Sequence, residues 1–119
     1  MNPKTETELS EAISASGGPL TIKGGGTRGI SLLGNLLGTH DMTGISLYEP
    51  GSLTMVAGAG TTLQEIETEL AKENQCLAFE PMDHRGLLGS VGEPTIGGIV
   101  AANISGSRRI QAGACRDHL

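Results

Sequence analysis

Apolar residues recur at the spacing of an amphipathic helix in two segments of the chain. In residues 9–13 these apolar residues lie on one helical face. Residues 5–8, just before them, have the Thr-x-x-Glu spacing of a capping box. The glycines and proline at 17–19 predict the end of this helix. In residues 63–71 a longer apolar stripe follows a second capping-box sequence at 62–65. The pattern predicts two helices, the second with its apolar face on a sheet.

Shorter apolar runs predict strands at residues 20–23, 44–48, 53–57 and 76–79. The turn Glu49-Pro50-Gly51-Ser52 has proline in its second position and joins two of these strands into a hairpin. A further short helix is expected within residues 95–105, after a long polar loop at 81–94. Residues 30–37 are apolar but interrupted by Gly34 and Asn35, so we expect irregular structure there, and a loop over 106–119. The sequence contains no internal repeat.

Glycine is unusually frequent, with 19 of 119 residues, and it gathers where apolar runs end. The first cluster, residues 24–29, follows a predicted strand, and the second, Gly97-Gly98, opens a predicted helix. Glycine has no Cβ, so successive backbone N–H groups can approach a bound anion closely. Two such clusters suggest a ligand with two phosphates. For Gly97-Gly98 and the small residues that follow, close packing of the helix on a sheet is an equally good interpretation.

Two glycine segments also match dinucleotide or nucleotide motifs in part. Gly24, Gly26 and Gly29 have the G-x-G-x-x-G spacing, but no helical stripe follows them as a Rossmann fingerprint requires. Residues 58–63 follow a strand and open a helix, yet Leu63 stands where the third glycine would be. We interpret Gly58 and Gly60 as turn glycines.

Composition excludes several classes of function. A net charge of −5 argues against a nucleic-acid partner, and no apolar stretch reaches the length of a transmembrane helix. Cys76 and Cys115 are too few for a disulfide scaffold, and with the three histidines they lack metal-ligand spacing, so no metal site is predicted and a reducing, cytoplasmic location is expected. Asp83-His84-Arg85 is a polar cluster that either contacts a ligand or partner or anchors a loop. We favour the anchor.

Four motifs occur in the order and spacing of a known superfamily: Lys-Gly-Gly-Gly-Thr-Arg at 23–28, Thr-Met-Val-Ala-Gly-Ala-Gly-Thr at 54–61, Thr-Ile-Gly-Gly-Ile-Val-Ala-Ala-Asn at 95–103 and Gly-Ala-Cys-Arg-Asp at 113–117. With them the chain resembles the FAD-binding domain of the vanillyl-alcohol oxidase/PCMH superfamily. Within that superfamily, residues 79–89 and 106–117 resemble the family of FAD-binding subunits of bacterial glycolate oxidases.

The resemblance implies a PCMH-type α+β fold with FAD between two subdomains. Residues 1–119 would form a partial domain, the first subdomain and the start of the second, without the C-terminal remainder and the substrate cap. The FAD-binding residues that the resemblance implies are Gly24, Gly25, Gly26, Thr27, Arg28, Thr95, Ile96, Gly97, Gly98, Ala101, Ala102, Asn103, Ser105, Gly113, Arg116 and Asp117. Relatives that attach FAD covalently have a histidine where this chain has Thr27, so non-covalent FAD is expected.

The resemblance further implies a flavin-dependent oxidoreductase acting on a 2-hydroxy acid such as glycolate. The catalytic groups of the family lie in regions that this chain lacks, so we assign no catalytic residue and expect the fragment alone to be inactive. The implied partners are a second flavin subunit and an iron–sulfur subunit, which could also attach the protein peripherally to the inner membrane. The alternative is a non-catalytic assembly module that docks on a related catalytic flavin subunit.

Overall fold

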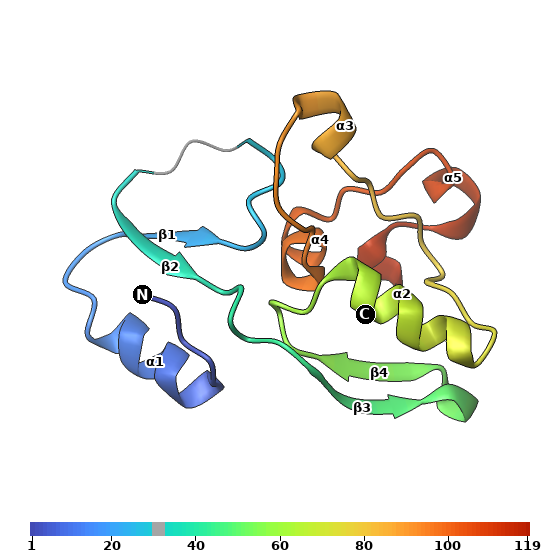
Figure 1. The fold of residues 1–119 in the computed structure, drawn as a ribbon, viewed down its shortest axis with the longest axis horizontal. Helices are drawn as coiled ribbons and strands as arrows, with labels where there is room; N and C mark the ends of the chain where they lie inside the picture. The colour runs from blue at the N-terminus through green and yellow to red at the C-terminus, as the bar shows by residue number, and fades with distance from the viewer. Residues whose placement is uncertain (30–32) are drawn as a thin grey trace.

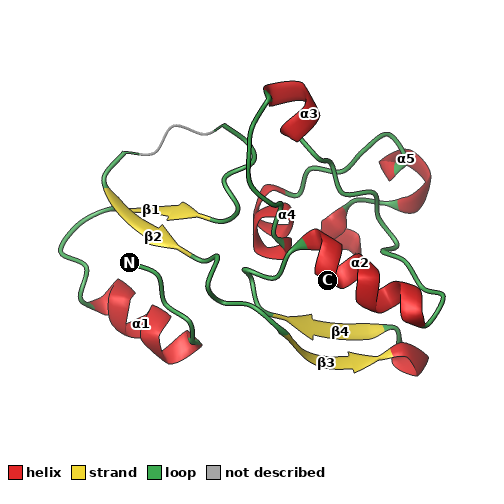
Figure 2. Cartoon of the chain, viewed as in Figure 1, coloured by secondary structure: helices red, strands yellow, loops and turns green. Residues whose placement is uncertain are grey.

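The structure is a computed structural model that describes residues 1–29 and 33–119. Its elements are α1 (Glu6–Ser14), β1 (Leu20–Lys23), β2 (Asn35–Gly38), β3 (Ile45–Glu49), β4 (Thr54–Ala57), α2 (Leu63–Lys72), α3 (Arg85–Leu88), α4 (Ile96–Ala102) and α5 (Arg109–Ala112), with 3-10 turns at Pro50–Ser52 and Cys115–His118. The molecule is elongated, 45 × 32 × 23 Å. In the described chain, α1 precedes the strands of two small sheets and α2 to α5 follow them (Figures 1 and 2), a mixture that agrees with the predicted α+β class.

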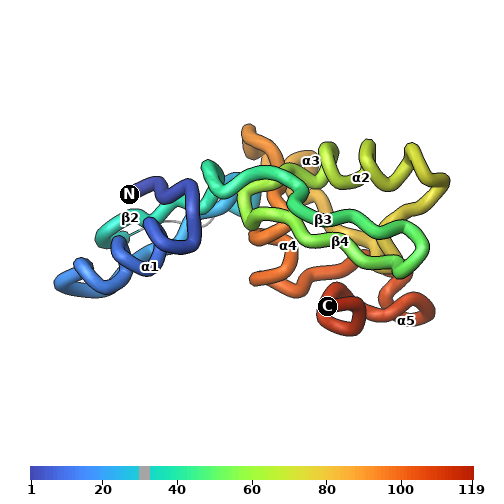
Figure 3. The backbone as a smooth tube through the Cα atoms, turned by 90° about the horizontal axis from the view of Figure 1, so that it is seen from below, coloured from blue at the N-terminus to red at the C-terminus, as the bar shows by residue number. Residues whose placement is uncertain are grey.

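The N-terminal segment, with α1, β1 and β2, extends to one end of the molecule (Figure 3). Thr5 caps α1 by accepting a hydrogen bond from the N–H of Glu8. The Glu8 carboxylate accepts from the N–H of Lys4 and not from that of Thr5, so the predicted capping box is only half formed. The predicted helix and its end before residues 17–19 are confirmed.

β1 pairs in parallel with β2, in a register that places Leu20 opposite Asn35. The prediction of irregular structure for residues 30–37 is therefore wrong at Asn35, Leu36 and Leu37, while residues 30–32 lie outside the described part of the chain. Gly34 has a φ of 93° and lies immediately before the strand. The strand was missed because its stability comes from a partner about fifteen residues earlier and from the burial of Leu37 rather than from a local pattern.

The predicted hairpin is confirmed as the antiparallel pair β3 and β4. The predicted second helix, α2, begins at a complete capping box, in which the Thr62 side chain accepts from the Glu65 N–H and the Glu65 carboxylate accepts from the Thr62 N–H. The Thr62 hydroxyl also donates to the Glu65 carboxylate, and this hydrogen bond, together with the one from the Thr62 N–H, lowers the pKa of Glu65. The apolar stripe of α2 buries Ile66 and Leu70, whereas Ala71 is exposed.

The hairpin turn contains a strained residue. Leu53 adopts a left-handed φ of 51° and its side chain is 82% exposed. Left-handed backbone costs a residue with a Cβ roughly 1 kcal/mol or more, and asparagine tolerates it better. We expect Leu53→Asn to raise the free energy of unfolding by about 0.5–1 kcal/mol in urea denaturation. Leu53→Ala, which removes the exposed apolar atoms but retains the Cβ, should give no comparable gain; an equal gain would assign the effect to exposure and not to backbone strain.

A small core joins α4 to the C-terminal segment. Phe79, Ile99 and Cys115 are buried together, with Leu63, Leu77 and Val100 packed around them. Burial of Cys115 raises the pKa of its thiol, which fits the role of a small buried hydrophobe. Residues 76–79 do not form the predicted strand, because Leu77 and Phe79 pack on this core and no strand pairs with the segment in the described structure.

Two predicted loops contain short helical turns. The helix α3 interrupts the 81–94 loop, and α5 and the 3-10 turn Cys115–His118 lie within 106–119, which therefore is not a simple loop. The predicted helix within 95–105 is confirmed as α4. Thr95 caps α4, and Asn103 ends it in the left-handed conformation. In the described residues, no helix has the length and apolarity needed to cross a membrane.

Candidate functional site

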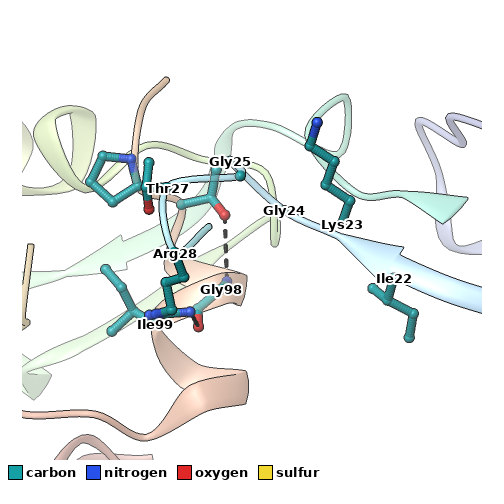
Figure 4. Close-up of a pocket in the computed structure, with 11 residues that line it drawn as sticks. Ile22, Lys23, Gly24, Gly25, Thr27, Arg28, Gly98 and Ile99 are labelled. Atoms are coloured by element: carbon teal, nitrogen blue, oxygen red, sulfur yellow. Dashed lines mark hydrogen bonds between the residues drawn. The ribbon is translucent and has the colours of Figure 1, made fainter. Parts of the chain in front are cut away.

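The first glycine cluster forms one wall of a cavity. After β1, Gly24, Gly25, Gly26, Thr27 and Arg28 turn back toward α4 and lie opposite its first residues (Figure 4). Pro94, Thr95, Gly98 and Ile99 form the opposite wall. The structure therefore brings together two segments about seventy residues apart, as the two-cluster hypothesis requires.

Backbone N–H groups of this loop are available to a ligand. In the described part of the chain, the N–H groups of Gly25, Gly26 and Thr27 have no hydrogen-bond acceptor. Gly26 has a φ of 72°, a left-handed conformation that glycine adopts without strain. A turn of this kind presents several amide protons within a short length of chain, which is the arrangement that binds phosphate oxygens.

The charge around the cavity is positive although the chain as a whole is acidic. Lys23 and Arg28 line the cavity, and no carboxylate is among its lining residues in the described structure. A Cβ built at Gly26 would lie 2.9 Å from Lys23 Cε, so the lysine side chain lies along the glycine loop. Lys23 was not among the predicted site residues, but it directly precedes the glycine run, which was the available signal.

Arg28 connects the glycine loop to α4. Its Nη1 donates a hydrogen bond to the carbonyl oxygen of Gly98 at 2.6 Å. Its Nε is buried without a hydrogen-bond partner in the described structure. A buried, unpartnered guanidinium N–H is costly, so this atom indicates a place for an acceptor that the chain itself does not provide.

The second glycine cluster does not have the free amides that we predicted. The Ile96 N–H donates to the Thr61 carbonyl at 2.9 Å, and the Gly97 N–H donates to the Ala59 carbonyl at 2.9 Å. The Gly98 N–H faces the Thr95 hydroxyl at 3.4 Å, a weak contact. The prediction that Gly97 and Gly98 expose unpaired N–H groups is therefore wrong at Gly97.

Close packing explains why residue 97 is glycine. A Cβ there would lie 2.7 Å from both the Cβ and the carbonyl oxygen of Ala59. The segment around Gly58 and Gly60 thus accepts the start of α4, and Thr62 and Thr95 form an isolated β-bridge beside it. Of the two interpretations left open by the sequence, packing holds for Gly97, while Gly98 lines the cavity.

The remaining predicted residues lie away from the cavity lining. Asn103 accepts a hydrogen bond from the Arg116 N–H, and Ser105 accepts one from the Cys115 N–H. These contacts hold the 113–117 segment against the end of α4.

The other predicted residues outside the cavity have local contacts or are exposed. The Asp117 carboxylate accepts a hydrogen bond from the Ala114 N–H, and Gly113 has a φ of 81°. Ala101 is exposed and Ala102 half-buried. Contact of these six residues and Arg116 with a cofactor stays a prediction.

The Asp83-His84-Arg85 cluster behaves as a loop anchor. The Arg85 Nε and Nη2 donate to the Asp83 carboxylate at 2.8–3.1 Å, and Nη1 donates to Glu93 at 3.0 Å. The hydrogen bonds from Arg85 lower the pKa of Asp83, and those to Asp83 raise the pKa of Arg85. His84 precedes α3 without a capping hydrogen bond from its side chain. Within the described residues, no cluster of three or more potential metal ligands occurs.

Comparison with known proteins identifies the family. The sequence matches the FAD binding domain family over residues 1–119. It is 35% identical over 113 residues to glycolate oxidase subunit GlcE of Escherichia coli K12, a match that covers 92% of this chain and 30% of that protein. The chain therefore spans about 30% of the length of this curated relative. No solved structure gives a significant match. By its match over every residue and its mixed helices and sheets, the chain belongs to the PCMH-type FAD-binding domain family, and FAD is the cofactor of that family.

Proposed function

We propose that the chain is the FAD-binding portion of a flavin-dependent oxidoreductase subunit that oxidises a 2-hydroxy acid such as glycolate. One observation carries the proposal most directly: within the described structure, the glycine loop offers an anion three amides without an acceptor, together with Lys23 and Arg28, and no carboxylate is among the lining residues. The relative named as a glycolate oxidase subunit supports the substrate class.

The residues present fit the diphosphate of FAD better than the whole cofactor. The cavity holds about 160 Å³, below the roughly 300–1,000 Å³ of pockets that enclose a small-molecule ligand. We infer that residues 24–28 bind the diphosphate through backbone N–H groups and that Arg28 Nε donates to one of its oxygens. Bound FAD supplies a two-electron acceptor, and the protein supplies its binding and orientation.

Non-covalent binding and a multi-subunit assembly belong to the same proposal. Thr27 is buried at the position where a covalently attaching relative would have histidine, and its carbonyl oxygen accepts a hydrogen bond from Ser90. The relative is named as a subunit, which supports assembly with other chains. We propose a second flavin subunit and an iron–sulfur subunit as partners, in a cytoplasmic protein or one attached peripherally to the inner membrane through them.

One observation favours the alternative of a non-catalytic assembly module. The N–H groups of Ile96 and Gly97 are bonded within the protein, so part of the expected cofactor site is engaged in holding the fold. In that case the glycine loops would persist as structural elements, and the chain would dock on a related catalytic flavin subunit.

Titration of the purified chain with FAD and with riboflavin tests the proposal. Riboflavin has the flavin ring but no phosphate, so binding through the glycine loop predicts much tighter binding of FAD, competition by ADP, and flavin absorbance after desalting. Equal binding of both ligands would refute the diphosphate assignment. A colourless protein that co-purifies with a flavin subunit would support the assembly module instead.

A further inference from the structure

The loop formed by residues 83–93 lies directly behind the glycine loop. It contains the Asp83-His84-Arg85 cluster, for which the sequence allowed two interpretations: contact with a ligand or partner, or a loop anchor. Because it is followed at once by Pro94 and Thr95, which line the cavity, its position affects both walls of the site.

Arg85 closes the 83–93 loop on itself. Its guanidinium forms a two-pronged pair with Asp83 at the beginning of the loop. Its Nη1 reaches the end of the loop, where it donates to the carboxylate of Glu93 at 3.0 Å and the carbonyl of Gly92 at 3.2 Å. One side chain therefore holds together positions ten residues apart. A planar, forked guanidinium can form these hydrogen bonds in several directions at once, which an ammonium group cannot do with the same geometry.

The end of the 83–93 loop is in close contact with the glycine loop. A Cβ built at Gly25 would lie 1.8 Å from the carbonyl oxygen of Glu93, and one built at Gly92 would lie 2.7 Å from the carbonyl oxygen of Gly25. Ser90 adds a hydrogen bond from its hydroxyl to the Thr27 carbonyl at 2.5 Å. The backbone of residues 25–27 thus rests on residues 90–93, whose own position depends on Arg85.

We propose that Arg85, paired with Asp83 and Glu93, is a positioning residue for the diphosphate-binding loop. Arg85 is not among the cavity-lining residues. It acts by fixing Gly92 and Glu93, which support the conformation in which the amides of Gly25, Gly26 and Thr27 point to the ligand. This inference rests on the proposed binding of the FAD diphosphate at residues 24–28.

The test uses Arg85→Gln in the full chain, with Lys72→Gln as the matched control. Lys72 also loses one positive charge and one exposed ion pair, with Glu69, but it lies on α2 outside the cavity. We expect Arg85→Gln to raise the Kd for FAD about three- to tenfold, because several charge-assisted hydrogen bonds are lost from a partly exposed network. Arg85→Lys keeps the charge without the fork and should recover only part of the affinity. The Kd for riboflavin should not change in any variant.

Backbone ¹⁵N relaxation in the ligand-free protein provides a second measurement. Arg85→Gln should lower the NMR order parameters of the backbone amides of residues 24–28 while leaving those of α1 unchanged. This result is independent of FAD binding, so it separates the inference from the proposed function. If wild type fails to bind FAD, the proposed function is wrong, whereas the order parameters still report whether Arg85 fixes the glycine loop. Unchanged order parameters at 24–28, or an equal loss of affinity in Lys72→Gln, would overturn the positioning role.

Discussion

Replacement of Gly60 by alanine is expected to lower the free energy of unfolding by about 1–3 kcal/mol or more, the range of overpacking. A Cβ at this position would lie 2.5 Å from the carbonyl oxygens of both His40 and Thr39. Backbone atoms cannot move aside as a flexible side chain can, and the N–H of Gly60 is itself bonded to the Met42 carbonyl at 2.8 Å. The substitution must therefore separate two backbone segments that meet beside the first residues of α4.

Urea denaturation followed by circular dichroism measures this effect, with Gly51→Ala as the control. Gly51 lies in the hairpin turn, where an added Cβ would have no heavy atom within 4 Å, and its φ is not positive. The control should stay within about 0.5 kcal/mol of wild type. Similar values for the two variants would show that residues 39–42 adjust without cost and that Gly60 is an ordinary turn glycine.

Replacement of Gly25 by alanine is expected to weaken FAD binding about tenfold or more. From the sequence, the missing Cβ is expected to let the backbone N–H groups approach an anion closely. The structure gives a different reason, because a Cβ would lie 1.8 Å from the carbonyl oxygen of Glu93 and would push the glycine loop off the 83–93 loop. Strain of about 1–3 kcal/mol, if it is released by displacing the loop, corresponds to roughly a five- to 150-fold loss of affinity.

Gly86→Ala is the matched control for this prediction. Gly86 lies in α3, within the same 83–93 loop, and a Cβ there meets nothing within 4 Å. Fluorescence titration should give a wild-type Kd for FAD with Gly86→Ala and a raised one with Gly25→Ala. Wild-type affinity in Gly25→Ala would show that the diphosphate binds elsewhere in the protein.

The two glycine clusters show where sequence reasoning succeeded and where it could not. Both clusters were found, and the structure places residues 24–28 and Gly98 on facing walls of one cavity. The sequence could not tell that Gly97 donates to Ala59 while Gly25 has no acceptor in the described structure. At both residues a Cβ would lie too close to a backbone atom of another segment, so the absence of a side chain does not by itself distinguish a packing glycine from a binding one. Only the neighbouring groups that each residue meets in the folded chain make that distinction.

The strands and the Asp83-His84-Arg85 cluster also show which features the sequence could predict and which it could not. The hairpin was predicted because its turn and both strands are adjacent in sequence. β2 was missed, and residues 76–79 were assigned a strand that they do not form, because a strand exists only where a partner supplies its hydrogen bonds. For Asp83 and Arg85, proximity in sequence indicated an anchor, but their connection to Gly25 through Glu93 could not be predicted from spacing.

The sequence by itself determined the α+β class, the two capped helices, the hairpin and the positions of the two glycine clusters. Helical periodicity, capping side chains and turn residues act over a few neighbouring positions, so they can be read without a partner. The tertiary structure alone decided which amides of the described residues lack an acceptor, which glycines serve packing, and how Arg85 comes to hold Gly92 and Glu93 beside Gly25. Those properties depend on which carbonyl oxygens from distant segments lie opposite each N–H, and that is determined only when the chain has folded.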